Sequence, residues 1–379
     1  MQVNKKYLNN NLKNIILEPL YNERENLKRK KLIKLLKTVL LYQYENCKEY
    51  KNICKYFKFK PQKLNNFSEI PYLTSTVFKE NLISSIPKSK IFRQINSSAT
   101  TSKNYSKIVL DKDNNYRWSL SLQKMFLDRV GNEKYKILFL DTKENLKKTS
   151  ILSARSSMLK SFLFVSKSYS TCLKLRKGQL ELDKRALNNF FKSIKKHEKI
   201  MIFGFTYVIY KYFLKEIIRH KKNYNLNNAL LVHAGGWKKL EKEKVSRKKL
   251  NSIIQKFLKI KTDNIIDIYG FSEQGGLLYP TCEKGFRHCT NYSTLIVRDF
   301  KNFKVVEKIK KIGFLQFITP IQLSYPGNSF LTEDVGRIEG IDDCKCGRKG
   351  IYFKVIGRYK HETEIRGCGD IMAKQFHEK

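Results

Sequence analysis

The sequence lacks two features that would place the chain in a membrane or outside the cell. A membrane-spanning helix needs about 18 or more consecutive apolar residues, and the longest apolar candidate, which begins at Ile200, stops at Lys211. The first residues lead into an Asn-rich stretch without the apolar segment of a signal peptide. We therefore expect no transmembrane segment and a cytoplasmic protein. Eight cysteines in 379 residues are then expected to be thiols or metal ligands rather than disulfides.

The chain is also poor in acidic residues, with 34 Asp and Glu against 76 Lys and Arg, which gives a formal net charge of +42. The lysines are spread along the whole sequence and form no compact basic arm, so they indicate a solvated surface and no specific nucleic-acid partner. Such a surface would still attract anionic substrates such as nucleoside triphosphates. With 41% hydrophobic and 12% aromatic residues, the chain is expected to fold rather than stay disordered.

Hydrophobic spacing predicts helix from about residue 23 to 57, because apolar residues recur there every three or four positions. Short apolar strands then alternate with amphipathic helices, which favours an α/β fold with a largely parallel sheet. The predicted strands are Ile137–Leu140, Ile200–Phe203, Leu230–Val232 and Ile265–Ile268, and the predicted helices between them are Tyr207–His220 and Lys239–Leu258.

After Pro280 the pattern changes to one typical of antiparallel strands, starting at Thr294, at Lys304 and at Gly313. No internal repeat and no long linker is found. We expect an N-terminal helical region over residues 1–70, an α/β core over 71–330, and a terminal segment with a short tail over 331–379.

The first candidate for chemistry is a loop rich in hydroxyl groups before the strand-like Ile108. Six Ser and Thr residues, among them Ser97, Ser98, Thr100 and Thr101, lie there with two lysines. Hydroxyls and backbone N–H groups suit the binding of a polyphosphate. The alternative is a solvated loop without a ligand.

Two more candidates follow predicted buried strands, where open α/β sheets bind ligands. Tyr269 to Glu273 comes after one strand, and a glutamate there can hold Mg²⁺ on a nucleotide; the alternative is a tight turn. Gly235 and Gly236 follow the strand before it, and paired glycines allow a flat ring to approach the backbone. His233, next to them, is expected to be structural.

The last part of the chain combines an acidic residue, a Gly-Arg pair and a cysteine. Asp334 stands before what is expected to be a tight Val-Gly turn, and Gly357-Arg358 ends a predicted strand. This pattern suits a site for a ribose and a phosphate. Cys368 lies near the end, and a thiol beside Arg366 could be nucleophilic; the alternative is an unreactive cysteine.

The other cysteines fall into two groups. Cys47, Cys54 and Cys172 lie in apolar or helical surroundings and are expected to be buried. A Cys-x₅-His-Cys segment and a distant Cys-x-Cys could supply tetrahedral ligands to a structural Zn²⁺. The preferred set is Cys282, His288, Cys344 and Cys346, with Cys289 nearby and free thiols as the alternative.

These motifs, in this order, resemble those of the adenylate-forming enzymes, and the closest resemblance is to the acyl-protein synthetase of bacterial bioluminescence, the fatty-acid–luciferin-component ligase. The resemblance covers nearly the whole chain. It is carried by Ser97–Ser102, Tyr269–Glu273, Thr332–Gly336, Gly357–Arg358, Phe203–Thr206, His233–Lys238 and Glu364–Cys368.

The resemblance implies a large α/β domain with mixed sheets and a small barrel-like β subdomain, without most of the C-terminal domain of the superfamily. It also implies roles for single residues. The β- and γ-phosphates would be held by Ser97, Ser98, Thr100 and Thr101, and adenine would lie between Gly236 and Tyr269. Glu273 would bind Mg²⁺, Asp334 would bind the ribose hydroxyls, and Arg358 would bind the ribose or the α-phosphate. Cys368 would accept the acyl group.

The sequence departs from the family pattern at several places. Ala99 and Ser102 replace usual glycines, which makes the phosphate loop stiffer, and Tyr359-Lys360 replaces the usual acidic hinge. The resemblance implies an ATP-dependent ligase that adenylates a carboxylic acid, namely a fatty acid. The enzyme would then pass the acyl group to a thiol and from there to a protein acceptor. The alternatives are a phenylacetate–CoA-type ligase and a nucleotide-binding protein with impaired catalysis.

Overall fold

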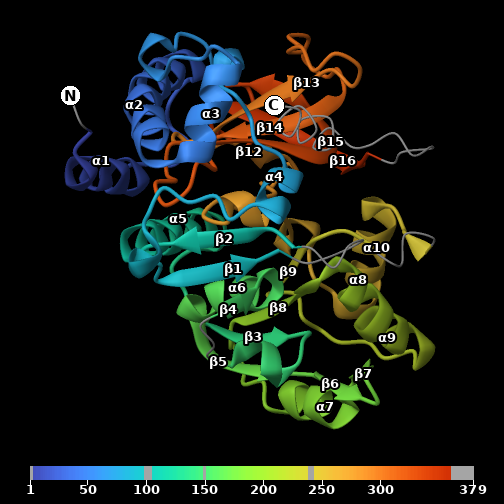
Figure 1. The fold of residues 1–379 in the computed structure, drawn as a ribbon. Helices are drawn as coiled ribbons and strands as arrows, with labels where there is room; N and C mark the ends of the chain where they lie inside the picture. The colour runs from blue at the N-terminus through green and yellow to red at the C-terminus, as the bar shows by residue number, and fades with distance from the viewer. Residues whose placement is uncertain (1–2, 98–104, 148–150, 238–242, 360–379) are drawn as a thin grey trace.

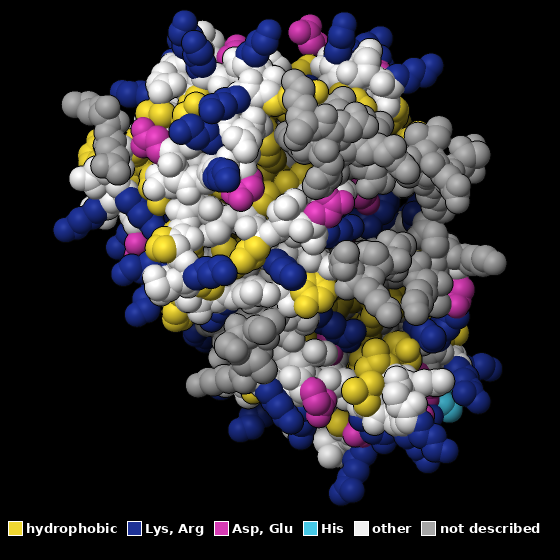
Figure 2. Space-filling model, viewed as in Figure 1, with side chains coloured by type: hydrophobic (Ala, Val, Ile, Leu, Met, Phe, Trp, Pro, Cys, Tyr) yellow, Lys and Arg dark blue, Asp and Glu magenta, His cyan; other side chains and the backbone are white. Residues whose placement is uncertain are grey.

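The computed structural model describes residues 3–97, 105–147, 151–237 and 243–359. Figure 1 shows the N-terminal helices beside an antiparallel sheet in one part of the molecule, and an α/β sheet with its helices in the other. Among the described residues, no helix combines the length and the apolar character needed to cross a bilayer. On the face in Figure 2, Lys and Arg side chains occur from one end of the molecule to the other, as their spread in the sequence suggests.

Helices make up the N-terminal part of the structure. They are α1 (Lys5–Leu17), α2 (Glu25–Asn46), α3 (Lys48–Tyr56) and α4 (Ser75–Glu80), with 3₁₀ turns at Pro61–Lys63, Phe67–Glu69 and Lys88–Lys90. The helix predicted over residues 23–57 is confirmed with one break at Cys47, whose extended backbone ends α2 and precedes α3. Leu32, Leu36 and Leu40 of α2 belong to one buried cluster with Ile318 and Phe330 of the antiparallel sheet. This apolar stripe joins the helices to that sheet.

A six-stranded sheet forms the centre of the α/β part, in the order β11-β10-β9-β8-β3-β5. All its neighbouring strands are parallel except β11, which is antiparallel to β10. The strands are β3 (Tyr135–Phe139), β5 (Ser166–Thr171), β8 (Ile200–Phe205), β9 (Leu230–Ala234), β10 (Ile265–Tyr269) and β11 (Tyr279–Pro280). The four predicted strands are therefore confirmed, and they are neighbours in one parallel sheet.

Helices cover both faces of this sheet, because successive strand residues point to opposite sides. Ile137 and Phe139 of β3 pack with α5 (Lys112–Val130) and α6 (Ala154–Ser161), whereas Leu138 belongs to the cluster on the other face. That other face is covered by α7 (Lys184–Lys192), the helical segment after β8, and α10 (Arg247–Leu258). The predicted start of α10 at Lys239 is wrong: residues 244–246 are not helical, and Ser246 caps the helix by accepting from Lys249 N–H.

The helix predicted over Tyr207–His220 is confirmed but is not a regular α-helix. It consists of α8 (Thr206–Val208), a π-helical segment at Ile209–Leu214 and α9 (Lys215–Arg219). Lys215 N–H donates to the carbonyl of Tyr210, five residues back, which is the hydrogen bond of a π-helix. Such wide turns are rare and often lie beside functional sites.

A second sheet of five antiparallel strands has the order β12-β16-β15-β14-β13. Its strands are β12 (Arg287–His288), β13 (Thr294–Arg298), β14 (Gly313–Ile318), β15 (Ser329–Ile341) and β16 (Ile351–Arg358). No pairing between the edge strands β12 and β13 closes it into a barrel within the described part of the chain. Phe317 and Phe353 from this sheet share a buried cluster with Tyr279 of β11, so one core joins the two sheets.

Two local predictions in this region are wrong. The strand expected from Lys304 is only an isolated bridge between Val305 and Arg298. The Val335-Gly336 pair does not form a tight turn but lies within β15, where the pairing with β16 shifts register. A Cβ on Gly336 would lie 2.3 Å from the carbonyl oxygen of Lys354, so this glycine permits close approach of two strands rather than a reversal of the chain.

The remaining strands support the loop of hydroxyl residues. β1 (Arg93–Asn96) pairs antiparallel with β2 (Lys107–Leu110) and parallel with β4 (Ile151–Ser153). Residues 97–106 therefore connect two paired strands, and Ser97 and Ser106 lie at the base of the connection. A small hairpin of β6 (Leu173–Arg176) and β7 (Gln179–Leu182) lies beside α7 at the far end of the molecule (Figure 1).

Candidate functional site

Three of the predicted site residues meet where the two sheets adjoin. Asp334 and Arg358 are register partners on β15 and β16, and Arg358 Nε lies 3.6 Å from Asp334 Oδ1. Tyr269, the last residue of β10, donates its hydroxyl hydrogen bond to Asp334 Oδ2 at 2.7 Å. Asp334 and Arg358 are thus gathered with Tyr269, which is 65 residues from Asp334 in the sequence. They meet at the carboxyl end of a parallel strand, the usual place for a ligand in such a sheet.

The Asp334 carboxylate is largely enclosed, with 20% of its side chain exposed, whereas Arg358 is 57% exposed. Burial raises the pKa of Asp334, while the Arg358 charge and the Tyr269 hydroxyl act in the opposite direction. The carboxylate oxygens can accept hydrogen bonds from a pair of hydroxyls. The partly exposed guanidinium can reach a neighbouring anion.

A second group of residues links the base of the hydroxyl loop to Glu273. Glu273 is 6% exposed, and its Oε1 accepts a hydrogen bond of 2.6 Å from the Ser106 hydroxyl. Ser106 N–H donates in turn to Ser97 Oγ at 2.8 Å, and Ser97 N–H donates to the carbonyl of Ser106. Tyr325 fixes the backbone by donating to the carbonyl of Glu273. Ser106 therefore connects Ser97 to Glu273 through hydrogen bonds.

Burial raises the pKa of Glu273, and the Ser106 hydrogen bond and the charge of Arg358 lower it. The influence of Arg358 on both Glu273 and Asp334 shows that the two groups of residues are electrostatically connected. Among the residues that the structure describes, Glu273 forms no ion pair. A buried carboxylate of this kind fits a divalent ion, because the ion would remove the cost of its charge.

The Gly235-Gly236 turn at the end of β9 leaves space next to the backbone. Gly235 has a φ of +74°, a conformation that favours glycine. A Cβ built on Gly236 would meet no atom within 4 Å. The Thr206 hydroxyl lies 2.8 Å from the carbonyl oxygen of Gly235 and 2.9 Å from Nδ1 of His233. These contacts fit the prediction that His233 is structural, because its ring holds Thr206 and burial lowers its pKa.

Several predicted site residues lie outside the described part of the chain. These are Ser98, Thr100 and Thr101 of the hydroxyl loop, the neighbouring Ala99 and Ser102, and Cys368 with its flanking residues.

The four predicted zinc ligands do come together. The ligand atoms of Cys282, His288, Cys344 and Cys346 all lie within 4.8 Å of one another, and Cys346 Sγ is 3.3 Å from His288 Nε2. Cys282 and His288 come from the β11–β12 region, whereas the other two come from the turn between β15 and β16. Gly347, with a φ of +88°, reverses the chain directly after Cys346.

The electrostatics of this cluster suit a cation. Burial and the nearby Arg348 lower the pKa of His288 to about 3, so its imidazole is neutral at ordinary pH. The Cys346 thiol has a lowered pKa despite its partial burial, because the backbone N–H of Arg348 stabilises the thiolate. Three cysteine sulfurs and a neutral imidazole in a tetrad of this size match the donor set of structural zinc. Cys289, next to His288, is not part of the tetrad, and burial raises its pKa to about 12.

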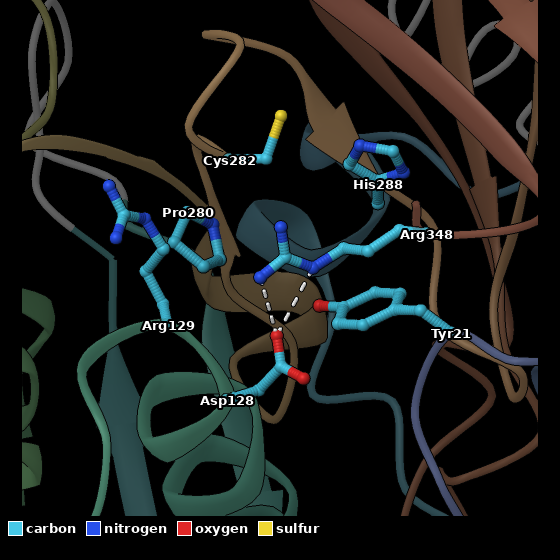
Figure 3. A pocket seen from close by; sticks show the side chains of 7 residues that line it. All are labelled: Tyr21, Asp128, Arg129, Pro280, Cys282, His288 and Arg348. Atoms are coloured by element: carbon cyan, nitrogen blue, oxygen red, sulfur yellow. Dashed lines mark hydrogen bonds and ion pairs between the residues drawn. The ribbon is translucent and has the colours of Figure 1, made fainter. Parts of the chain in front are cut away.

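The surroundings of the tetrad exclude substrate chemistry there. Figure 3 shows Arg348 over the ring of Tyr21, with Cys282 and His288 on its other side. Its guanidinium donates to Asp128 at 2.8 Å. Another bond from Arg348 goes to Glu283 at 3.0 Å. The cavity among these side chains has a volume of about 10 Å³, room for no more than one water molecule. A metal here would be structural.

Sequence reasoning missed Ser106 and Tyr325 as parts of the Glu273 site. Ser106 stands at the far end of the predicted hydroxyl loop, so the antiparallel pairing of the flanking strands could have indicated it. Tyr325 comes from a segment 52 residues away that carries no motif. Sequence reasoning also missed a buried ion pair at the end of β3, between Asp141 and Arg155.

Comparisons with known proteins agree with this geometry. The family model described as acyl-protein synthetase, LuxE, matches residues 1–377. The structure is similar to that of 2-hydroxyisobutyryl-CoA ligase in the postadenylation state, with a TM-score of 0.67 and 14% identity over 89% of this chain and 69% of that one. An open conformation of the same ligase, in complex with an adenylate and CoA, also has a TM-score of 0.67 and 14% sequence identity, over 94% of this chain and 82% of that one. Among proteins with curated descriptions, none matches in sequence. At this identity the structural likeness establishes the fold, which confirms the predicted adenylate-forming α/β architecture.

Proposed function

Because the chain belongs to the LuxE acyl-protein synthetase family, we propose that the residues at the ends of β9, β10, β15 and β16 activate a carboxylic acid with ATP and prepare it for a thiol. The family makes the protein an AMP-forming ligase that activates acyl groups. The observation that carries the proposal is the meeting of Tyr269, Asp334 and Arg358. The Ser97–Ser106–Glu273 connection beside it supports the proposal further.

In the first step, an oxygen of the substrate carboxylate attacks the α-phosphorus of ATP, and the bond to pyrophosphate breaks. The product is an acyl-adenylate, in which AMP is a good leaving group. The chain contributes by holding the reactants: Asp334 accepts hydrogen bonds from the ribose hydroxyls, and Gly236 and Tyr269 lie against the adenine. Arg358 approaches the ribose or the α-phosphate, where it offsets negative charge.

The β- and γ-phosphates are assigned to the hydroxyl loop, with Ser97, Ser98, Thr100 and Thr101 as donors. Glu273 is assigned to a magnesium ion, which when bound neutralises charge on the phosphates. Ser106 orients the Glu273 carboxylate toward a fixed position, and the raised pKa of Glu273 indicates a group that benefits from a nearby cation.

In the second step, a thiol sulfur attacks the acyl carbonyl, the bond to AMP breaks, and the thiol proton is released. We assign the thiol to Cys368, by the resemblance of residues 364–368 to the family, and a further transfer to a protein acceptor. Arg366 next to it would favour the thiolate. The buried Cys47 is unsuited to this role, because burial raises its pKa to about 12. The acid is assigned to the fatty acids by the same resemblance.

We also assign a structural Zn²⁺ to Cys282, His288, Cys344 and Cys346. The metal would tie the β11–β12 region to the β15–β16 turn. His288 of β12 pairs with Tyr352 of β16. Arg358 lies six residues beyond Tyr352 on the same strand, which is a distance of about 20 Å. The ion would therefore hold the sheet from a distance and take no part in the reaction.

The first test is ATP–pyrophosphate exchange that depends on an added carboxylic acid. Wild-type protein should exchange label with at least one acid from a panel of fatty, aryl and sugar-linked acids. Glu273→Gln should reduce the rate by on the order of 100-fold, because the magnesium ion loses a ligand. The exposed variant Glu307→Gln is the control. Absence of exchange with every acid would contradict the activation proposal.

The role of Asp334 predicts a pH dependence of ATP binding. Asp334→Asn should weaken ATP binding about 10- to 100-fold, as expected for hydrogen bonds to a charged group of about 1.5–3 kcal/mol. Because burial raises the Asp334 pKa, wild-type affinity should fall as the pH drops through a value above that of an ordinary aspartate. The variant should lack the part of this fall that comes from Asp334, so its affinity should change less than that of wild type in calorimetric titrations between about pH 8 and pH 4.5. Glu307→Gln, which removes an exposed carboxylate that forms no part of the site, should behave like wild type.

The role of Cys368 predicts a covalent intermediate. Wild-type protein incubated with ATP and a radiolabelled acid should keep the label after denaturation and lose it to hydroxylamine. Cys368→Ala should exchange pyrophosphate normally but keep no label, whereas Cys47→Ala should be labelled like wild type. Equal labelling of the Cys368 variant, or transfer only when coenzyme A is added, would remove the assignment.

The zinc assignment predicts about one zinc per chain in protein purified without a chelator. Cys346→Ser should lose the metal and be destabilised by about 3 kcal/mol or more, the linkage expected when the ion stands at a hundred times its Kd or above. Cys289→Ala should keep the metal. Metal analysis and urea unfolding measure both effects. A zinc-free preparation that is fully folded and equally stable would rule the metal out.

A further inference from the structure

A buried ion pair lies at the carboxyl end of β3, outside the groups assigned to ATP. Asp141 is 0% exposed, and its Oδ1 accepts hydrogen bonds from the backbone N–H of Thr142 and from Asn145 Nδ2, both at 2.7 Å. Its Oδ2 accepts a bond of 2.6 Å from Arg155 Nε. Asp141 therefore engages only one of the three guanidinium nitrogens of Arg155.

The two terminal nitrogens of Arg155 are poorly used within the described residues. Nη1 lies 3.4 Å from the Tyr207 hydroxyl, a long distance for a hydrogen bond, and Nη2 is buried without a hydrogen-bond partner. A buried donor without an acceptor is unfavourable. Terminal guanidinium nitrogens form a planar fork that matches both oxygens of a carboxylate. The arrangement therefore suits an anionic group brought by a ligand.

Arg155 lies on the same sheet edge as the nucleotide residues but at a different strand. Tyr269 ends β10, Gly235 follows β9, Phe205 ends β8 and Asp141 follows β3, and these four strands are successive neighbours. The ends of β10 and β3 are three strand positions apart, about 14 Å. A molecule that begins at the nucleotide site and runs along this edge would therefore reach Arg155 with its far end.

Aromatic side chains lie next to Arg155 and next to the Gly235–Gly236 turn. Arg155 lies over the ring of Phe205 with its guanidinium carbon 5.5 Å from the ring centroid. The same ring faces the Gly235 turn, since a Cβ on Gly235 would be 3.2 Å from Phe205 Cδ1. Tyr210, in the π-helical segment, packs edge-on against Trp237 at 5.1 Å. Rings of this kind suit a carbon skeleton, while Arg155 suits a charge at its end.

We propose that Arg155 binds a second carboxylate on the acid substrate, so that within the fatty-acid class the enzyme prefers acids that carry an anionic group remote from the reacting carboxylate. This rests on the proposed function, in which the acid is activated at the ends of β9 and β10. The reacting carboxylate itself is a poorer match for Arg155, because the α-phosphate must lie near Asp334 and Arg358, on the other side of two strands.

The test compares dicarboxylic acids with monocarboxylic acids of equal length, including terephthalate against benzoate and an aliphatic series. Binding is measured by calorimetry with and without a non-hydrolysable ATP analogue, and activation by pyrophosphate exchange. Wild-type protein should prefer the dicarboxylate by about tenfold or more, as bidentate recognition of a carboxylate implies. Arg155→Gln should abolish the preference and leave monocarboxylate binding and ATP affinity within about twofold of wild type.

Two further variants keep the outcome interpretable. Arg155→Gln leaves the Asp141 carboxylate buried and unpaired, so the double variant Asp141→Asn/Arg155→Gln, which removes both charges, is measured beside it. Arg185→Gln, on the exposed surface of α7, controls for the loss of one positive charge. Equal binding of both acid classes by wild type, no binding of any dicarboxylate, or an equal loss for both classes in the variants would overturn the assignment. Arg155-dependent binding without exchange would instead contradict activation and support the binding role.

Discussion

The antiparallel pairing of β15 with β16 is the interaction on which the candidate sites depend. It runs from Asp334 and Arg358 at one end to Ile341 and Ile351 at the other. The register decides that the carboxylate and the guanidinium are partners, and it decides equally that the connecting turn presents Cys344 and Cys346. A shift of one residue would turn each side chain to the opposite face of the sheet. Gly336 makes the close approach of the strands possible at the point where the register changes.

The site beside this pairing is organised by buried polar contacts rather than by apolar packing alone. Glu273, Ser106 and Ser97 form a chain of hydrogen bonds, and Tyr269 connects Asp334 to the parallel sheet. Polar networks of this kind stabilise one arrangement when every member has a partner. The aromatic core beneath them keeps the end of β10 in place. The ring centroid of Phe317 is 5.7 Å from that of Tyr269 and 5.2 Å from that of Phe271. Rigid support from both sides explains how residues from separate sheets keep a common geometry.

Much of the architecture could be predicted from the sequence because strong periodicity marks it. The apolar runs at Ile137, Ile200, Leu230 and Ile265 gave four strands of one sheet, and the Cys-x-Cys pattern with Cys282 and His288 gave a compact tetrad. Short motifs were less reliable about local shape: Val335-Gly336 suggests a turn, yet long-range pairing makes it part of a strand.

Two buried contacts carried no sequence signal. The Asp141–Arg155 pair and the Tyr325–Glu273 bond depend on how helices and sheets pack, and no local pattern of residues encodes them. The strand expected at Lys304 was predicted from the local sequence pattern, but it does not form, because such a pattern does not supply a partner strand. Topology, not composition, decides these cases.

The π-helical turn at Ile209–Leu214 has a consequence for how variation in this chain would be tolerated. Each residue of an α-helix advances the chain by about 100° around the axis, so the extra residue in the turn sets the rotational phase between Tyr207 and the buried side chains Phe213 and Ile217. Removing one residue here would restore a regular helix and leave Phe213 and Ile217 in place. It would turn Tyr207, together with the buried Val208 and Ile209, around the helix axis. A single-codon deletion would therefore change both the surface next to Tyr207 and the core contacts of Val208 and Ile209.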